Sequence, residues 1–283
     1  MAKIKITCDS TCDLTDEIYR KLDVEVVPLG VILGDELKRD GVNVSERELF
    51  AYTERTGTLP KTSAISVGEY AEVFRKFVSQ GYSVIHVSLS SELSACYSNA
   101  RMAAEEVGSV WAVDSLNLSS GSGHLVMTAA ELAEQGYEAA EIAERLNVLR
   151  ERLDVSFVLQ TLEYLHKGGR CSGVALLGAN LMKIRPEIRV IGGGMQVGSK
   201  LRGNMRATVM KYIRVRLEGR DDIDTRRIFV THTEMPREIV DEAMDLVRQL
   251  HPFDEVIETV ASSTISSHCG PACLGVLFYK KGE

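Results

Sequence analysis

Short apolar strand patterns alternate with amphipathic helix patterns over the first half of this chain. Strands are predicted at residues 4–8, 24–29, 83–89 and 110–113. Between the second and third strands, Ser66 with Glu69 three residues later is a capping box that starts a helix, and Gly81 is its stop signal. Helices that alternate with strands in this order cover a parallel sheet. The pattern therefore predicts an α/β unit built on a parallel sheet.

Further helix signals complete this first unit. Ser45 with Glu48 repeats the capping-box signal, and Gly136 closes another helix. Residues 138–153 form a long amphipathic pattern, and the chain then enters a strand pattern without a linker rich in Pro, Gly or Ser. We place a domain boundary near Asp154.

The second half mixes element types in an irregular order. Helices are predicted at 174–184, from Met205 and from Pro236, a hairpin at 187–200 around three glycines, and strands at 155–160, 228–232, 255–260 and 272–279. Such an order is typical of an α+β domain with a mixed sheet. The predicted fold is therefore an N-terminal parallel-sheet α/β domain, residues 1–154, followed by a C-terminal α+β domain, residues 155–283.

Composition narrows the class of protein. The 283 residues are 45% apolar, which is enough to fill hydrophobic cores. The first ten residues contain no apolar signal-peptide core, and the longest apolar stretches are shorter than a membrane span, so a cytoplasmic location is expected. Because the cytosol is reducing, the six cysteines are expected to stay thiols.

Charge is distributed unevenly along the chain. The formal net charge of −7 argues against broad binding to nucleic acids or anionic membranes. Between Lys183 and Arg220, however, ten basic residues stand against Glu187 and Glu218, a local net charge of +8. Two interpretations of this basic region stay open. It is either a solvated cationic helix and hairpin or a docking face for an acidic or phosphorylated partner.

Polar loops follow the strands of the predicted parallel sheet. They contain Asp9, Ser10 and Thr11 after the first strand, Ser88 to Ser94 after the third, and Asp114 with Ser115 after the fourth. Ligands collect outside the carboxyl ends of parallel strands, and Thr62 with Ser63 precedes a helix that can reach the same edge. Each hydroxyl alone is better explained as a helix cap or turn residue. Together they predict a binding site.

Three residues indicate that the ligand of this site is an anion. Ser94 opens a predicted helix, and the free N–H groups at a helix start attract negative charge. Arg170 follows two glycines and can form a bidentate pair with a carboxylate. His268 is predicted to lie in a loop before the last strand, where it would be a structural histidine if the other site residues were absent. The combination suits an oxyanion.

The sequence lacks the motifs that would indicate nucleotide binding or a zinc site. The glycine-rich runs match neither the GxxxxGK[ST] loop nor the GxGxxG turn, so nucleotide binding is unsupported. Cys8 with Cys12 and Cys269 with Cys273 are more widely spaced than usual zinc pairs and lie among apolar strand residues. We therefore expect buried thiols, with no metal and no cofactor.

Seven motif segments follow one another along nearly the whole chain: CDSTCDL, KTSAIS, SSELSACYSNA, VDSLNLSSGSG, LEYLHKGGR, IRPEIRVIGGGMQVGSKLRG and HCGPACLG. Together they resemble the DegV family of bacterial fatty-acid-binding proteins, the lipid-carrying subunits of fatty acid kinase. The resemblance implies a DegV-like fold with the ligand between the two domains. It also implies that Thr62 and Ser94 hydrogen-bond the fatty acid carboxylate, with Arg170 and His268 close to the head group.

The resemblance assigns further residues to supporting and docking roles. Supporting positions are Ser63, Ser10, Thr11, Asp114 and Ser115, and Arg202 with Arg206 lies on the surface expected to face the kinase. The chain departs from the family pattern at Ala95-Cys96, where Gly-Thr is usual, and at Ala64-Ile65, where Gln-Pro is usual. A slightly different head-group geometry is therefore expected.

The leading functional hypothesis is a non-catalytic carrier that binds a long-chain fatty acid and presents its carboxylate to a separate kinase. The kinase would form an acyl phosphate, and transient membrane contact would allow lipid exchange. A competing hypothesis is a serine-dependent esterase in which Ser94 and His268 form a triad with Asp9 or Asp114, although no GxSxG elbow is present. A third hypothesis, an anion-sensing domain, predicts a small polar pocket.

Overall fold

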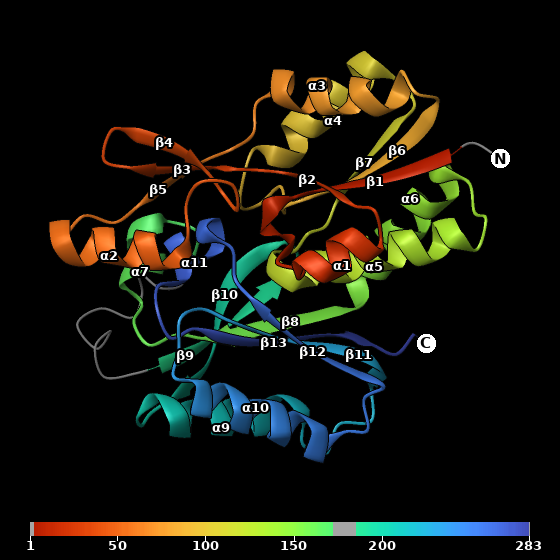
Figure 1. Cartoon of the computed structure of the whole chain (residues 1–283). Coiled ribbons are helices and arrows are strands. Elements are labelled where there is room, and N and C mark those ends of the chain that lie inside the picture. The colour runs from red at the N-terminus through yellow and green to blue at the C-terminus, as the bar shows by residue number, and fades with distance from the viewer. Residues whose placement is uncertain (1–2, 172–184, 283) are drawn as a thin grey trace.

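The computed structural model describes residues 3–171 and 185–282, and it stacks helices and sheets in five layers (Figure 1). Helices α3 (Val67–Val78) and α4 (Cys96–Val107) cover the upper face of a parallel sheet. Helix α5 (Ser119–Glu134) lies between this sheet and a mixed sheet, and α9 (Met205–Leu217) with α10 (Arg237–Leu250) covers the lower face. The helix predicted at 174–184 falls outside the described residues.

The predicted parallel sheet is confirmed. Its strands, in spatial order, are β2 (Glu25–Val27), β1 (Lys3–Asp9), β6 (Tyr82–Ser88) and β7 (Val110–Asp114), and every neighbouring pair is parallel. The capping box that starts α3 is also present, because the Ser66 hydroxyl accepts the Glu69 N–H and the Glu69 carboxylate accepts the Ser66 N–H. The helix α1 (Asp16–Lys21) connects β1 to β2.

The second half forms the predicted mixed sheet. Its order is β10 (Gly194–Leu201), β9 (Arg185–Ile191), β8 (Leu153–Val158), β13 (Leu274–Lys280), β11 (Ile223–His232) and β12 (Glu255–Val260). Only β11 and β12 are parallel to each other among these described pairs. The expected hairpin is β9 and β10, and its tip reaches the first half, where the Ser90 hydroxyl donates to the Gly193 carbonyl at 2.8 Å.

A small third sheet was not predicted. Strands β3 (Gly30–Leu33), β4 (Glu36–Arg39) and β5 (Lys61–Ser63) pair antiparallel in the order β4-β3-β5, beside α2 (Glu46–Thr56). The sequences ELKR and KTS contain too few apolar residues to show a strand period. Their backbone pairing with the apolar strand β3 makes them strands.

Two other sequence predictions were wrong in detail. The helix expected at 138–153 ends earlier: α6 (Ala139–Leu149) is followed by a single 3-10 turn, and Leu153 already begins β8. The segment around His268 is not a loop but the helix α11 (Ser263–Cys269), which a serine-rich composition concealed. A short helix α7 (Glu163–Gly168) precedes Arg170.

One hydrophobic core joins both halves of the chain. It fills the space on both sides of α5 and includes Ile6 and Val87 from the parallel sheet together with Phe157 and Leu277 from the mixed sheet. A separate core lies beneath the mixed sheet, between its lower face and helices α9 and α10. The mixed sheet begins with β8 at Leu153, so the boundary placed at Asp154 falls inside this strand, and packing continues across it.

Carboxylates from the first half hold the beginning of α11. Asp13 Oδ1 accepts the Ser262 N–H and Asp40 Oδ1 accepts the Ser263 N–H, both at 2.9 Å. Burial raises the pKa of Asp13 to about 7, although hydrogen bonds from Ser119 and Ser262 oppose this shift. Because these bonds satisfy N–H groups that a helix start leaves without partners, they fix α11 against the first half.

A second buried carboxylate organises the loop after β6. Asp9 ends β1, and its side chain accepts hydrogen bonds from the Tyr70 hydroxyl at 2.6 Å, the Ser88 hydroxyl at 2.8 Å and the Leu89 N–H at 2.7 Å. Asp9 is fully buried, so these donors replace the water that the carboxylate loses. The backbone that leads from β6 toward Ser94 is anchored as a result.

Removing one of these donors tests the anchor. We predict that Tyr70→Phe lowers the free energy of unfolding by about 1.5–3 kcal/mol, because a hydrogen bond to a buried charged group is lost while the ring is kept. Urea denaturation followed by circular dichroism measures the change. Tyr137→Phe, at a partly exposed tyrosine, is the matched control and should shift unfolding much less. Equal shifts in the two variants would contradict the role given to Asp9.

Candidate functional site

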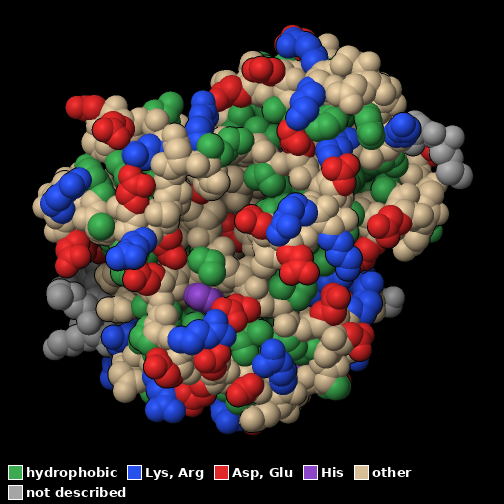
Figure 2. Space-filling view, in the orientation of Figure 1, with side chains coloured by type: hydrophobic (Ala, Val, Ile, Leu, Met, Phe, Trp, Pro, Cys, Tyr) green, Lys and Arg blue, Asp and Glu red, His purple; other side chains and the backbone are tan. Residues whose placement is uncertain are grey.

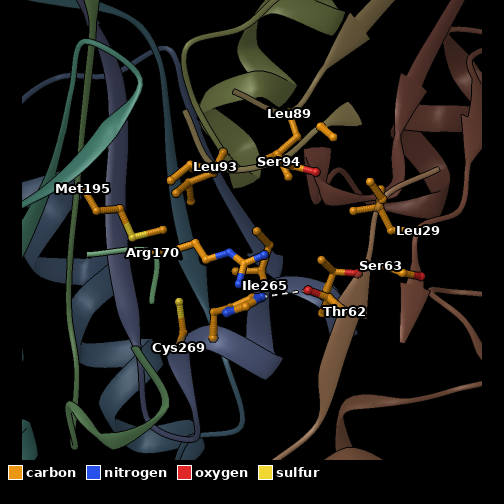
Figure 3. A pocket seen from close by; sticks show the side chains of 15 residues that line it. Leu29, Thr62, Ser63, Leu89, Leu93, Ser94, Arg170, Met195, Ile265 and Cys269 are labelled. Atoms are coloured by element: carbon orange, nitrogen blue, oxygen red, sulfur yellow. Dashed lines mark hydrogen bonds between the residues drawn. The ribbon is translucent and has the colours of Figure 1, made fainter. Parts of the chain in front are cut away.

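A cavity of about 220 Å³ lies between the two halves and brings together the four principal residues predicted from the sequence (Figure 3). Thr62, Ser94, Arg170 and His268 all line it. The other described residues along its wall are Leu29, Ser63, Ala64, Leu89, Leu93, Ala95, Leu118, Met195, Thr264, Ile265 and Cys269. Polar groups are therefore concentrated in a few side chains, and most of the remaining wall is apolar.

Thr62 and His268 meet directly across the cavity. Thr62 lies on β5, His268 lies near the end of α11, and the Thr62 Oγ1 is 2.9 Å from the His268 Nε2 in a hydrogen bond. The other face of the imidazole is tight, since a Cβ on Gly168 would lie 2.5 Å from Nδ1. Glycine at position 168 thus lets the backbone at the end of α7 approach the ring.

Arg170 supplies the positive charge of the site. Its Nη1 donates to the Gly168 carbonyl at 2.7 Å, and Gly169 between them has the positive φ of 69° that glycine adopts easily. Burial, and to a smaller extent the nearby Arg170 guanidinium, lowers the pKa of His268 to about 4. His268 is therefore neutral at pH 7. Of the described residues along the wall, Arg170 is the only lysine or arginine.

Ser94 lies two residues before α4, and the N-cap of this helix is Ala95 rather than the Ser94 that the sequence predicted. The Ser94 hydroxyl accepts the Cys96 N–H at 3.2 Å and donates to the Cys96 Sγ at 3.1 Å. Burial raises the pKa of Cys96 to about 11, so the thiol is neutral at pH 7. A thiol sulfur is a weak acceptor. The Ser94 hydroxyl can therefore turn from Cys96 to a better acceptor, such as a carboxylate, at low cost.

Two predicted supporting residues act behind the cavity wall. The Ser10 hydroxyl accepts the Leu29 N–H at 3.2 Å and donates to Asp40 Oδ2 at 2.9 Å, and Leu29 lines the cavity. Thr11 is fully buried in the 3-10 turn after β1. Neither residue reaches the cavity itself, so their support is indirect. Ser63, by contrast, is part of the wall.

The loop after β7 is also structural. Asp114 Oδ1 accepts the Ser91 N–H at 3.2 Å and the Leu116 N–H at 3.0 Å, which ties this loop to the one that precedes Ser94. Ser115 is fully buried and its hydroxyl donates to the Asn117 carbonyl at 3.1 Å. Both residues stabilise the loops at the carboxyl edge of the sheet, and neither lines the cavity.

The hydrolytic triad considered from the sequence is not assembled. His268 bonds Thr62 rather than Ser94, and its Nδ1 has no hydrogen-bond partner among the described residues. Asp9 and Asp114 bond other groups. A serine nucleophile needs a base within hydrogen-bond reach, and the base needs an orienting acid. The arrangement favours binding over hydrolysis.

Several arginines of the basic region form ion pairs with acidic side chains of the same chain. The buried Arg216 pairs with Asp154 and lies 3.2 Å from Glu187, and Arg220 pairs with the same Asp154 at 2.8 Å. Arg206 pairs with Glu242 of α10 at 2.5 Å. Acidic and basic side chains are interspersed over the lower part of the molecule in Figure 2. Arg202 is exposed and makes no ion pair within the described ranges.

The apolar wall was missed at the sequence level. Leu118, Met195 and Ile265 line the cavity without having been singled out from their pattern, and Cys269 was predicted only as a buried thiol. Ile265 and Cys269 are four residues apart, which is the spacing of one helix face, so assigning α11 as a helix would have shown them together. The other two come from distant segments, and only the fold brings them to this site.

The family model of DegV, described as an uncharacterised protein family, matches residues 3–281. The chain belongs to the DegV family. A DegV domain-containing protein of Clostridium acetobutylicum is 30% identical over 285 residues, covering 99% of this chain and 100% of the relative. One from Deinococcus radiodurans is 30% identical, covering 96% of this chain and 97% of the relative.

Solved DegV structures share the fold. A fatty-acid-binding DegV family protein from Thermus thermophilus matches with a TM-score of 0.86 at 29% identity, covering 99% of this chain and 100% of its own. A DegV lipid-binding protein from Thermotoga maritima matches with a TM-score of 0.85 at 26% identity, covering 98% of each chain. A stearic acid-binding protein from Eubacterium ventriosum gives a TM-score of 0.85 at 26% identity, again covering 98% of each chain.

Two further features are absent from residues 3–171 and 185–282. No helix in these ranges is both long and apolar enough to cross a membrane. The same ranges contain no group of three or more His, Cys, Asp or Glu side chains placed to hold a metal ion. All six cysteines are buried, and they include the four whose burial was predicted from the sequence, Cys8, Cys12, Cys269 and Cys273.

The protonation of His268 can be checked by titration. We predict that its ring resonances, followed by NMR, titrate near pH 4 and stay constant from pH 5.5 upward, because burial and Arg170 disfavour the imidazolium. Arg170→Gln should raise the midpoint while leaving it below the ordinary value of about 6.5, since burial is the larger cause. His268→Asn identifies the resonance. A midpoint near 6.5 in the unmutated protein would contradict this picture of the site.

Proposed function

We propose that this DegV family protein binds a long-chain fatty acid in the cavity between its halves and presents the carboxylate to a separate kinase. The observation that carries the proposal is the division of the cavity wall into a small polar group, with one arginine, and a larger apolar surface. A fatty acid has the same two parts. The descriptions of the Thermus, Thermotoga and Eubacterium relatives as fatty-acid-binding or lipid-binding proteins support it.

The head group lies where the polar residues converge. The hydroxyls of Thr62 and Ser94 donate to the carboxylate oxygens, and the Arg170 guanidinium balances the charge. An ionised carboxylate without these partners would cost several kcal/mol beside an apolar wall, or would take up a proton. In this arrangement the single hydrogen of the Thr62 hydroxyl goes to the carboxylate, so the neutral His268 donates its Nε2–H to the Thr62 oxygen and keeps this side chain oriented.

The tail supplies most of the affinity. Burial of each methylene contributes about 0.8 kcal/mol, so a chain of about sixteen carbons gains on the order of 10 kcal/mol before losses of ligand freedom. Leu29, Leu93 and Met195 are among the side chains that would contact it. Such a ligand leaves the protein slowly, which suits a carrier rather than a transient sensor.

Phosphorylation requires a partner that holds ATP. A carboxylate oxygen would attack the γ-phosphorus, the bond from that phosphorus to the bridging oxygen would break, and acyl phosphate with ADP would result. This chain has neither of the two nucleotide-binding loops sought in its sequence, and in the proposal it takes no catalytic part. The proposed docking surface contains Arg202 and Arg206, of which Arg206 already pairs with Glu242. The protein would act in the cytoplasm, where ATP is available.

Lipid analysis tests the proposal directly. We predict that the purified protein contains about one fatty acid per chain, measured by mass spectrometry of an organic extract. Ser94→Ala should weaken fatty acid binding by about tenfold to a hundredfold, because a hydrogen bond to the charged carboxylate is lost. Binding to the delipidated proteins can be measured by displacement of a fluorescent fatty acid.

Ser98→Ala is the matched control for this experiment. Ser98 lies on α4, is exposed, and donates to the Ala95 carbonyl, so its loss removes a hydroxyl near the site without touching the cavity. It should bind like the unmutated protein. If the gently purified protein carries no fatty acid and binds none when it is offered, the proposed function is wrong. If Ser94→Ala binds as tightly as Ser98→Ala, then Ser94 does not contact the head group.

Partner docking is tested separately. We predict that Arg202→Glu lowers the rate of acyl phosphate formation by a fatty acid kinase about tenfold at low salt, while the amount of bound fatty acid stays the same. Arg248→Glu, at an exposed arginine of α10, is the charge-matched control and should have little effect. Equal rates for the two variants would place the docking surface elsewhere.

A further inference from the structure

Ser94 is hydrogen-bonded to a cysteine that does not itself line the cavity. Its hydroxyl donates to the Cys96 Sγ at 3.1 Å and accepts the Cys96 N–H at 3.2 Å. Cys96 is the first residue of α4, is fully buried, and is not among the described residues of the cavity wall. The direct link between Cys96 and the cavity is therefore the Ser94 hydroxyl.

The Ser94 oxygen is held in place, whereas its hydrogen can turn. The Ser94 N–H donates to the Ser90 carbonyl at 3.1 Å, and the Cys96 N–H holds the Ser94 oxygen at the start of α4. A hydroxyl hydrogen rotates to suit the best acceptor within reach. A carboxylate in the cavity can therefore take the hydrogen from the sulfur while the Ser94 oxygen stays where it is.

Behind Cys96, the contacts lead to a buried negative charge. The Cys96 thiol interacts with the Tyr70 hydroxyl, and this hydroxyl donates to Asp9 Oδ1 at 2.6 Å. Because the Tyr70 hydrogen goes to Asp9, the Tyr70 oxygen can accept the thiol hydrogen. Cys96, Tyr70 and Asp9 are all fully buried. The four residues thus form a chain of donors that runs from Ser94 through Cys96 and Tyr70 to the Asp9 carboxylate.

Sulfur makes the weakest hydrogen bonds of this chain. Hydrogen bonds in a chain polarise one another, so a hydroxyl at position 96 would extend the pull of the Asp9 carboxylate to the Ser94 hydrogen. A thiol is only a weak donor and a weak acceptor. Burial and the Asp9 carboxylate raise the pKa of Cys96 to about 11, so the thiol keeps its hydrogen at pH 7 and no thiolate competes for the Ser94 hydrogen.

We infer that Cys96 is a positioning residue that sets how readily Ser94 gives its hydroxyl hydrogen to a fatty acid carboxylate. The inference rests on the proposed function and names a determinant of affinity behind the same site. In the empty protein the sulfur holds the hydrogen weakly, so little is lost when the hydrogen turns to the ligand. A stronger acceptor at position 96 would compete with the carboxylate and weaken binding.

Substitutions at position 96 separate acceptor strength from side-chain size. Cys96→Ser nearly keeps the shape and adds a stronger acceptor, so it should weaken palmitate binding about threefold to tenfold, because one more hydrogen bond must be broken. Cys96→Ala removes the acceptor and should bind palmitate at least as tightly as the unmutated protein. A role in packing predicts the reverse order, since alanine leaves a cavity. Displacement of a fluorescent fatty acid from the delipidated proteins measures the affinities.

Cys8→Ser is the matched control for the change of thiol to hydroxyl. Cys8 is a fully buried cysteine of β1 and is not part of the described cavity wall, so this variant should keep the affinity of the unmutated protein. A double-mutant cycle tests the route of the effect. In the Ser94→Ala background, Cys96→Ser should cause no further loss of affinity, because it acts through the Ser94 hydroxyl.

Infrared spectroscopy tests the hydrogen bond without any change at Cys96, and so does not depend on how well the Cys96 variants fold. In the unmutated protein, the difference spectrum between the loaded and the empty state should contain a change in S–H stretching, because the sulfur loses the Ser94 hydrogen. This feature should be missing from Ser94→Ala at saturating palmitate. A thiol that responds to the ligand by another route would keep the feature in Ser94→Ala.

The outcomes separate this inference from the proposed function. Weaker binding in Cys96→Ser but not in Cys96→Ala, together with an S–H change that depends on Ser94, supports the role of Cys96. If Cys96→Ala binds most weakly, if all variants bind like the unmutated protein, or if loading leaves the S–H bands unchanged, the inference is wrong and the proposed function stands. If the unmutated protein binds no long-chain fatty acid, the proposed function itself fails.

Discussion

Hydrogen bonds between carboxylates of the first half and the start of α11 hold this molecule together at the cavity. Asp13 and Asp40 accept N–H groups that would otherwise be unsatisfied at a helix start, and Glu46 accepts the Ser266 hydroxyl at 3.1 Å. The same helix carries Ile265 and His268 into the cavity. Each side of the site therefore depends on the other half of the chain, and the cavity exists only while the halves are docked.

The parallel sheet could be predicted from the sequence because local and tertiary signals agree there. Ser66 and Glu69 cap α3 as expected, and the apolar strands form one sheet. The third sheet could not be predicted, since β4 and β5 are short, polar and stabilised by backbone pairing with β3. The helix α11 was missed because serine and threonine favour caps and turns over helix interiors, and here side chains from distant segments satisfy its first turn.

The polar residues of the site could be predicted from the sequence, but its apolar residues could not. Hydroxyls at the carboxyl ends of parallel strands do converge, but the sequence cannot show which of them turn inward. Ser94 faces the cavity, whereas Ser10 bonds the backbone of Leu29 and Ser115 bonds the backbone of its own loop at Asn117. The local sequence does not distinguish an apolar residue that lines the cavity from one in the core. Met195 in the wall has the same kind of surrounding sequence as a core methionine.

The charge state of the two basic residues explains why the site suits a single carboxylate. A protonated imidazole beside Arg170 would place two positive charges next to an apolar wall, where each one is costly to desolvate. Burial and the guanidinium instead keep His268 neutral, with a pKa of about 4. The net charge of the described wall is then +1, equal and opposite to one ionised carboxyl group. A dianionic phosphate would leave excess negative charge beside the apolar wall, so the electrostatics favour the acid over a phosphorylated ligand. In the proposed function, this mismatch would weaken the binding of the head group once the acid is phosphorylated, while the apolar contacts of the tail would stay the same.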